Sequence, residues 1–356
     1  MPIKEIVNRS HSHWMDATGA DSDIVISSRM RVARNLAGIP FPHLLNREKS
    51  GEVIHALRLA IKNQEAAELL GSLELCELSE LTPLERQILV DKHLISPEFL
   101  NNPEARAVVL RDDEVVSIMV NEEDHLRIQC LLPGLALKEA WNIIDKIDDG
   151  LEKTLDYAFC EKLGYLTSCP TNVGTGMRAS VMLHLPALKL TKQLYGVLNA
   201  IGKLGLTVRG LYGEGTEALG DLYQISNQIT LGQSEEDITN NLISSTCQIL
   251  SQERAARQIL YQKSTQAVED RVYRAYGTLK YARLLSSEEA MRLISDLRLG
   301  VALNIIPGIR VSLLNELMVK IRPAFLNKIS GQEMMPPERK VYRAGLVRKE
   351  LGGVPC

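Results

Sequence analysis

Three separated stretches of the chain carry residue types that suit phosphoryl transfer to a guanidine. Two are acidic, namely Asn121-Glu122-Glu123-Asp124-His125-Leu126-Arg127 and Arg209-Gly210-Leu211-Tyr212-Gly213-Glu214. The third is Cys169-Pro170-Thr171-Asn172-Val173-Gly174-Thr175-Gly176-Met177-Arg178-Ala179-Ser180. A guanidinium has a pKa above about 12, so an enzyme that makes it a nucleophile must orient it and accept its proton. Paired carboxylates can do both.

Five arginines on separate segments could bind the phosphates of a nucleotide, because each offers planar, permanently charged donors. They are Arg29, Arg31, Arg127, Arg178 and Arg209. The sequence contains no P-loop and lacks the glycine-loop, His-Arg-Asp and Asp-Phe-Gly set of protein kinases. The phosphates of a nucleotide would therefore have to be bound by other residues. Arg29 and Arg31 are expected on the same side of a strand. Taken singly, each arginine is more typical of a surface ion pair, and the prediction depends on the surrounding motifs.

The six cysteines are widely and irregularly spaced, with no Cys-x-x-Cys pair to suggest zinc or a redox couple. No metal-binding residues and no disulfide framework are therefore expected. Cys169 differs from the others because it precedes a proline and a glycine-containing run, where backbone N–H groups and nearby arginines would lower the pKa of a thiol. The remaining five are expected to be small buried hydrophobes. These are Cys76, Cys130, Cys160, Cys247 and Cys356.

The elements that must position these residues suggest an α+β fold. Residues 48–70 have helical spacing that stops at Gly71, and residues 105–132 form apolar runs typical of an antiparallel meander. Helical periodicity returns over 136–163, and residues 180–185 and 206–211 are expected to be strands. Strands flanked by helices without strict alternation favour α+β.

A helical C-terminal domain is expected after the β signals fade. Residues 253–282 are predicted to be helical, Ser286 and Glu289 fit a capping box for the next helix, and prolines divide the rest into short helices. Between residues 320 and 350 basic residues outnumber acidic ones by five, which could form an anion-binding face or simply a solvated helix surface. The predicted domains are 1–255 and 256–356.

The 356 residues can bury a sizeable core, and 45% hydrophobic with 24% charged residues is ordinary for a globular protein. A formal net charge of −3 gives no general attraction to nucleic acid or an anionic membrane. No apolar run approaches the ~18 residues of a membrane span, and the N-terminus lacks a signal-peptide pattern. A cytoplasmic location, without direct nucleic-acid or membrane partners, is expected.

With these motifs in this order, the chain resembles the ATP:guanidino phosphotransferases, the family of creatine and arginine kinases. The resemblance spans roughly residues 24 to 255 and implies a catalytic domain like that of the phosphagen kinases, with ATP and Mg²⁺. It implies that Glu123 and Glu214 hold the guanidine, that Cys169 lies beside it and that His93 contacts the nucleotide. The implied nucleotide-binding residues are Ser27, Ser28, Arg29, Met30, Arg31, His93, Arg127, Arg178, Ala179, Ser180, Val181, Met182, Arg209, Gly210, Leu211, Tyr212, Gly213 and Glu214.

Two departures narrow the substrate class and the expected regulation. In creatine and arginine kinases a helical domain precedes the first arginine motif and forms the lid over a small guanidine, whereas here that motif begins at Ser27. The chain is instead similar to the bacterial protein-arginine kinases of this family, which have a C-terminal helical region. Those proteins carry an Arg-Asp-x-x-Arg-Ala motif that resembles a phosphoarginine-binding site. Here Lys340 replaces the acid that could pair with a guanidinium, whereas Arg339 and Arg343 could still bind the phosphate of a phosphoarginine.

The predicted activity is in-line transfer of the γ-phosphoryl group to a protein arginine, with Glu123 as proton acceptor and Glu214 aligning the guanidine. The resemblance also implies heat-shock regulation, a transcriptional repressor as substrate, a Clp chaperone-protease as downstream reader and a homodimer; an activator protein is a further expected partner. A kinase for free arginine or another small guanidine remains an alternative. So does an adaptor protein in which catalysis is secondary.

Overall fold

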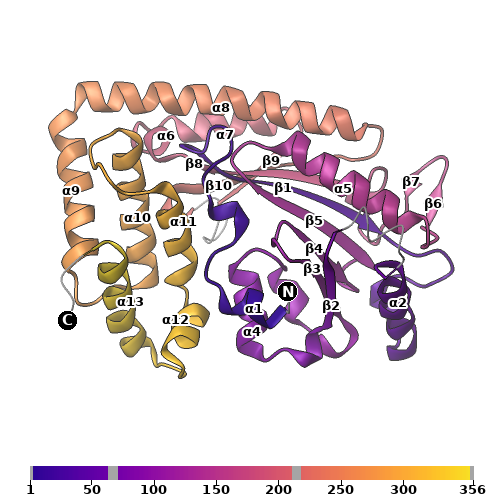
Figure 1. The fold of residues 1–356 in the computed structure, drawn as a ribbon. Coiled ribbons are helices and arrows are strands. Elements are labelled where there is room, and N and C mark those ends of the chain that lie inside the picture. Colours follow the sequence, from indigo (N-terminus) through magenta and orange to yellow (C-terminus); the bar gives the residue numbers. More distant parts are fainter. Residues whose placement is uncertain (1–2, 63–70, 211–217, 353–356) are drawn as a thin grey trace.

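An eight-stranded antiparallel sheet forms the centre of the protein (Figure 1). The structure is a computed structural model that describes residues 3–62, 71–210 and 218–352. The strand order is β2-β3-β4-β5-β1-β8-β10-β9. The strands are β1 (Val25–Arg34), β2 (Leu73–Glu77), β3 (Ala107–Arg111), β4 (Val116–Val120), β5 (Leu126–Pro133), β8 (Met177–His184), β9 (Leu206–Gly210) and β10 (Leu222–Asn227). A separate hairpin pairs β6 (Phe159–Cys160) with β7 (Gly164–Tyr165).

The sheet separates two hydrophobic cores because its side chains alternate between the faces. Met30 of β1, Ile128 of β5 and Val181 of β8 lie in the core that includes side chains of α2, α5 and α8. The other core joins Leu131 and Met182 to α1, α4 and the C-terminal helices. The helices in these layers are α1 (Ile3–Asn8), α2 (Arg47–Ala60), α4 (Pro83–Asp91), α5 (Leu137–Glu152), α6 (Pro186–Leu190), α7 (Leu194–Gly202) and α8 (Glu235–Lys263).

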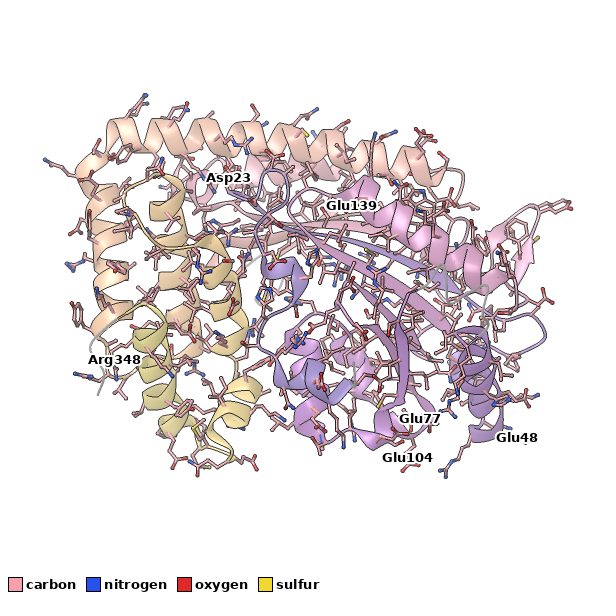
Figure 2. All side chains as sticks on the ribbon, viewed as in Figure 1. Asp23, Glu48, Glu77, Glu104, Glu139 and Arg348 are labelled. Carbon is pink, nitrogen blue, oxygen red and sulfur yellow. The ribbon has the colours of Figure 1, made fainter. Side chains whose placement is uncertain are left out.

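The C-terminal part is helical, as the sequence predicted. It contains α9 (Thr265–Tyr281), α10 (Ser287–Ala302), α11 (Val311–Lys320), α12 (Pro323–Ser330) and α13 (Pro336–Glu350). These helices gather at one end of the sheet, and α8 runs along the top of the sheet toward them (Figure 1). Asp23, which precedes β1, lies in this region (Figure 2). It forms ion pairs with Arg254 and Arg257 of α8. The predicted boundary between the domains, at residues 255 and 256, lies within α8, which continues through it without a break. The division into domains stays a prediction.

The predicted helix over 253–282 is two helices, and the first begins much earlier than expected. Ser234 starts α8 with a capping box, in which its hydroxyl accepts from the Asp237 N–H while the Asp237 carboxylate accepts from the Ser234 N–H. The helical run is interrupted at Ser264, whose φ of −146° is not helical. Of the predicted capping box, the structure records the half in which the Ser286 hydroxyl accepts from the Glu289 N–H at 3.0 Å.

Two other predicted helices are shorter than their periodicity suggested. Helix α5 ends at Glu152, because the following residues bond across to the segment after β1: Ala37 N–H donates to the Asp156 carbonyl and Ala158 N–H to the Asn35 carbonyl. The helix predicted over 48–70 is described as α2, and residues 63–70 lie outside the described part of the chain. The predicted meander is confirmed as β3, β4 and β5, with antiparallel pairing throughout.

Candidate functional site

The predicted phosphate-binding arginines come from four strands and share one face of the sheet. Paired residues of an antiparallel sheet point to the same side, and the register pairs Arg29 with Ser180 and Arg31 with Arg178. Arg127 pairs with Ala33 of the same strand as these two arginines. Arg209 pairs with Gln224, which in turn pairs with Met182. We call Arg29, Arg31, Arg127, Arg178 and Arg209 the arginine face.

Side chains of the adjacent strands hold two of these guanidinium groups in place. Arg29 donates to Gln224 Oε1 at 2.6 Å and to Ser180 Oγ at 3.4 Å. Arg178 donates to Ser226 Oγ at 3.4 Å. Gln224 and Ser226 alternate on β10, so one strand supports both arginines.

The electrostatics of the arginine face favour an anion. The pKa of Arg31 is lowered well below its ordinary value by burial and by the neighbouring charges of Arg29, Arg127 and Arg178. Burial and Arg209 similarly lower the pKa of Arg178. The Nε atoms of Arg31 and Arg178 are buried and have no hydrogen-bond partner among the described residues. An anionic group placed here would accept from these donors and relieve the repulsion between the charges.

The acidic run forms the hairpin between β4 and β5, and two of its three carboxylates are engaged in holding the loop. Asp124 accepts from Asn35 Nδ2 and from the Ser168 N–H, both at 2.7 Å. Glu122 forms an ion pair with Arg127 and accepts from the Ser96 hydroxyl. Although burial opposes it, these contacts lower the pKa of Glu122. Glu122 therefore remains a carboxylate that fixes Arg127.

Glu123 lies between these two acids and has a different environment. Its side chain is exposed, and partial burial together with Asp124 raises its pKa. A hydrogen bond from the Cys169 thiol to its carboxylate offsets part of this rise in pKa. A solvent-accessible carboxylate with a raised pKa is suited to accept a proton. Glu123 is thus the member of the run that can meet a substrate.

Cys169 links this hairpin to the arginine face. Its sulfur lies 3.0 Å from the Thr171 hydroxyl, and it interacts electrostatically with Arg178. The Thr167 hydroxyl donates to the Cys169 carbonyl at 2.8 Å and fixes the backbone. Cys169 and Glu123 therefore lie together beside Arg178 of the arginine face, and their roles at an acceptor site stay predictions.

His93 lies just after α4, near Arg29 of the arginine face. Its φ is +62°, its carbonyl accepts from Gln129 Nε2 at 2.9 Å, and its ring centroid is 5.4 Å from that of Trp14. Burial, with Arg29 and Arg322 nearby, lowers the pKa of His93 to about 3, so the imidazole is neutral at physiological pH. A neutral ring beside Arg29 can contact a nucleotide, and this role stays a prediction.

Comparison with known proteins identifies the family. Residues 52–256 match the model of the ATP:guanido phosphotransferase C-terminal catalytic domain. Residues 265–355 match that of the protein-arginine kinase McsB C-terminal domain. A protein-arginine kinase of Pelotomaculum thermopropionicum is 74% identical, with all of both chains covered. One of Desulforamulus reducens is 56% identical, with 99% of each chain covered. The chain belongs to the protein-arginine kinase branch of the ATP:guanido phosphotransferase family.

Solved structures agree with this family and confirm the predicted α+β fold. A lombricine kinase is 26% identical with a TM-score of 0.57, and the match covers 71% of this chain and 76% of that one. The duplicated taurocyamine kinase of Schistosoma mansoni, whose structure holds transition-state-analogue components, has a TM-score of 0.59 at 24% identity. That match covers 71% of this chain and 38% of the other. The antiparallel sheet with flanking helices is thus the catalytic scaffold of this phosphotransferase family.

Four of the predicted nucleotide-binding residues of this phosphotransferase point away from the arginine face. Met30, Ala179 and Val181 lie fully buried in the core on the opposite side of the sheet. The Ser28 hydroxyl donates to the Gly134 carbonyl and accepts from the Ala136 N–H, so it holds the chain that leads into α5. The reason is strand alternation, because a contiguous motif on a strand presents only every second side chain to one face. Ser27, Ser180 and Met182 have the parity of the arginine face.

Part of the predicted nucleotide and acceptor site falls on residues that the structure does not describe. Leu211, Tyr212, Gly213 and Glu214 lie outside the described residues. Gly210 ends β9 next to them. The pairing of Glu214 with Glu123 therefore stays a prediction.

The predicted phosphoarginine site of the C-terminal domain contains one arginine that is already committed to packing. Arg343 is 3% exposed, and its guanidinium donates to the carbonyls of Ile321 and Leu285 at 2.8 and 2.9 Å. Burial, with Arg339 and Arg322 nearby, lowers its pKa to about 10. Arg343 thus joins the loops before α10 and α12 to α13. Half-buried Arg339 donates to the Met334 carbonyl, and its binding of phosphate stays a prediction.

Sequence reasoning missed the neutral side chains that fix the charged ones. Gln224, Ser226 and Ser96 have no motif of their own, and only the alternation of Gln224 and Ser226 over 222–227 signals a shared face. Over the described residues no group of three or more His, Cys, Asp or Glu side chains gathers as a metal site would require. The same part of the chain has no helix that is long and apolar enough to cross a membrane.

Proposed function

We propose that this enzyme transfers the γ-phosphoryl group of ATP to the guanidinium of arginine side chains in proteins. The observation that carries the proposal is the arginine face bordered by Glu123 and Cys169. Two relatives that match along their whole length are named protein-arginine kinase, which supports a protein acceptor.

The arginines would bind the phosphates of ATP and stabilise charge on the transferring group. The buried Nε donors of Arg31 and Arg178 are positioned without other partners among the described residues, so their hydrogen bonds are available to phosphate oxygens. Because Gln224, Ser226 and Glu122 already hold Arg29, Arg178 and Arg127, the donors are pre-organised. Pre-organised charges of this kind are the main source of catalysis in phosphoryl transfer.

Mg²⁺ bound to the phosphates would neutralise part of their charge, as in other ATP phosphotransferases. The nucleotide phosphates, together with water molecules, would hold this ion. The protein's part is then to bind the phosphates through arginines. The carboxylates of the hairpin remain available for the acceptor.

Glu123 would orient the acceptor guanidinium and take its proton. A guanidino nitrogen forms a bond to the γ-phosphorus while the bond from that phosphorus to the β,γ-bridging oxygen breaks, and the bonding electrons leave with ADP. The proton lost by the nitrogen passes to the Glu123 carboxylate, whose raised pKa suits it to hold a proton. Cys169, which is hydrogen-bonded to Glu123, would contact the same guanidinium, and Glu214 would hold its other edge.

The biological setting is a second part of the proposal. We propose a role in stress regulation, with a heat-shock transcriptional repressor as substrate. We further propose that a Clp chaperone-protease reads the product and that an activator protein stimulates the kinase. A homodimer is the proposed assembly. These partners follow from the family resemblance and not from residue chemistry.

The test is to incubate the full chain with MgATP, an arginine-rich protein and free arginine, and to locate phosphate by mass spectrometry under non-acidic conditions that preserve the P–N bond. Phosphate on protein arginine alone is the expected result. Phosphate mainly on free arginine would show a small-guanidine kinase. Phosphate on neither, with an active protein-arginine kinase as positive control, would contradict the proposed activity of the isolated chain.

A further inference from the structure

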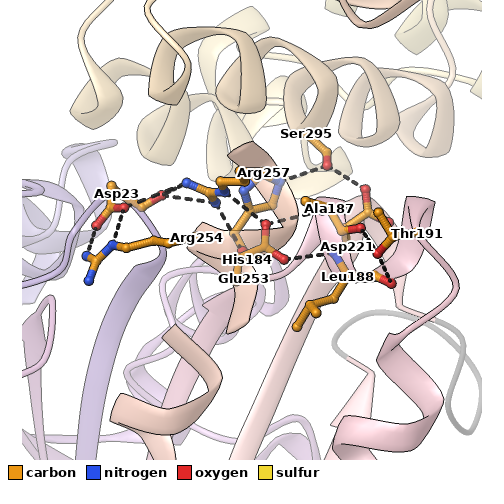
Figure 3. A network of polar contacts seen from close by, with 10 residues as sticks. All are labelled: Asp23, His184, Ala187, Leu188, Thr191, Asp221, Glu253, Arg254, Arg257 and Ser295. Carbon is orange, nitrogen blue, oxygen red and sulfur yellow. Dashed lines mark hydrogen bonds and ion pairs between the residues drawn. The ribbon is translucent and has the colours of Figure 1, made fainter. Parts of the chain in front are cut away.

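A buried hydroxyl of the C-terminal domain connects the ends of two strands of the arginine face. Ser295 lies on α10 and is 3% exposed. Its Oγ is 2.8 Å from His184 Nε2 and 2.7 Å from Asp221 Oδ2. His184 is the last residue of β8, and Asp221 directly precedes β10. Figure 3 shows Ser295 reaching from the helical layer toward Asp221.

The protons of this contact can be assigned from the donors available. The Ser295 hydroxyl has one hydrogen, and it donates to the Asp221 carboxylate, which can only accept. His184 Nε2 must therefore carry a hydrogen and donate to Ser295 Oγ. Burial and the charges of Arg298 and Arg257 lower the pKa of His184 well below its ordinary value, so the ring is neutral. Ser295 thus selects the tautomer of His184 and connects it to Asp221.

The start of β10 is shaped by its contact with α10. Asp221 has a φ of +56° and Gly220 a φ of +68°. A Cβ at Gly220 would lie 3.1 Å from the Met291 carbonyl of α10, so the backbone passes close to that helix. Asp221 is also bonded to Lys189 Nζ at 2.6 Å. The direction in which β10 leaves this turn therefore depends on contacts with α10 and α6.

Strands β8 and β10 carry the supports of the arginine face. Gln224, three residues after Asp221, holds Arg29, and Ser226 holds Arg178. Ser180 of β8 is the other contact of Arg29. A shift at the α10 end of either strand would move these supports.

We propose that Ser295 is a positioning residue through which the C-terminal domain sets the nucleotide affinity of the arginine face. The proposal depends on the function proposed above, because it assumes that the arginines bind ATP. Ser295 would act by fixing the positions of the ends of β8 and β10 relative to α10. A neighbouring polar contact of the C-terminal domain serves for comparison: Asn315 of α11 hydrogen-bonds with Arg298 of α10 and the Met15 carbonyl, and neither of these two residues belongs to β8 or β10.

The experiment measures binding of MgADP to the full chain by isothermal titration calorimetry. Ser295→Ala should raise Kd by about tenfold, as the loss of one well-placed hydrogen bond to a charged group would. Ser295→Thr, which keeps the hydroxyl, should restore most of the affinity. Asn315→Ala also removes buried hydrogen bonds, those with Arg298 and the Met15 carbonyl. Its Kd for MgADP should stay within about twofold of wild type despite a lower Tm. An equal loss of affinity in the Asn315 variant would reduce Ser295 to a general stabiliser and overturn the proposal.

Two further variants keep the result decisive. Lys189→Met removes the ion pair between Lys189 and the Asp221 carboxylate. Because the Lys189 side chain is half exposed, this variant should fold, and its Kd for MgADP should rise as in Ser295→Ala. It takes the place of Ser295→Ala if that chain does not fold, and an unchanged Kd would then overturn the proposal. Arg29→Ala tests the premise separately. If this variant binds MgADP as wild type does, the arginine face is not the nucleotide site; if only it loses binding, the function stands and the Ser295 proposal fails.

Discussion

Replacing Glu123 by glutamine should separate catalysis from nucleotide binding. Glutamine has nearly the same size and can still accept a hydrogen bond from a guanidinium, but it cannot take a proton. Proton transfer by a positioned side chain typically contributes about 10²–10⁴-fold, so kcat should fall by that factor. Glu123→Ala also loses orientation, to which up to roughly 7–11 kcal/mol has been attributed in well-aligned reactions, and should abolish measurable transfer.

The affinity for MgADP should change little in Glu123→Gln, because the bonds that fix Arg29, Arg127 and Arg178 do not involve Glu123. The matched control is Glu122→Gln in the same hairpin. It weakens the ion pair with Arg127, so it should raise the Kd for the nucleotide. The assay is phosphate incorporated into protein arginine per minute, with Kd from calorimetry. Glu123→Gln activity within about threefold of wild type would refute the assignment of the base.

The pH dependence gives an independent check of the same residue. Glu123 must be deprotonated to accept a proton, so wild-type kcat should fall as pH drops through its pKa, which lies above the usual ~4.3. The residual activity of Glu123→Gln should lack this decline. The sign for stability is opposite, since a raised carboxyl pKa means that the folded state binds the proton more tightly and loses stability as pH rises through that pKa. At neutral pH the glutamine variant should therefore be no less stable than wild type.

Three other substitutions test separate parts of the structure. Arg178→Lys keeps the charge but loses the planar fork, and should raise the Kd for MgADP about tenfold in calorimetry. Thiol alkylation should inhibit the wild type but not Cys169→Ser; inhibition of a fully active serine variant would mean that another cysteine is responsible. In the wild type the buried Arg34 Nε donates to the Asp148 carboxylate at 2.9 Å. Asp148→Ala leaves this guanidinium without its counter-charge and should lower the free energy of unfolding by about 3–5 kcal/mol in urea titration. The exposed control Glu52→Ala should cost under about 1 kcal/mol, and equal losses would contradict this reasoning.

The fold class and the arginines could be predicted from sequence because they depend on short-range patterns. Period-two spacing placed Arg29 and Arg31 on one face, and β-branched runs indicated the meander. The alignment of Arg127 and Arg178 with them could not be read in this way, because it depends on the register between strands far apart in the chain. That register also decides that Gln224 supports Arg29.

The errors arose where tertiary contacts override local periodicity. Residues 153–163 have helical spacing, yet backbone bonds of Asp156 and Ala158 to the segment after β1 divert the chain from α5. Met30, Ala179 and Val181 differ for another reason: the local alternation of a strand turns their side chains into the opposite core, and a backbone contact of theirs with the nucleotide stays a prediction. Position in a motif therefore does not show that a side chain contacts the ligand.

The run Glu122-Glu123-Asp124 shows how identical chemistry in sequence becomes three different functions in the fold. All three residues are carboxylates, and their chemistry does not distinguish them; in the sequence only the family resemblance selects Glu123. Their contacts in the fold distinguish them: Ser96 and Arg127 hold Glu122, while Asn35 and the Ser168 N–H hold Asp124. Their two negative charges then flank Glu123 and, with its partial burial, raise its pKa. The fixed carboxylates thus make the exposed one a better base, so removing either should lower the pKa of Glu123 as well as loosen the hairpin.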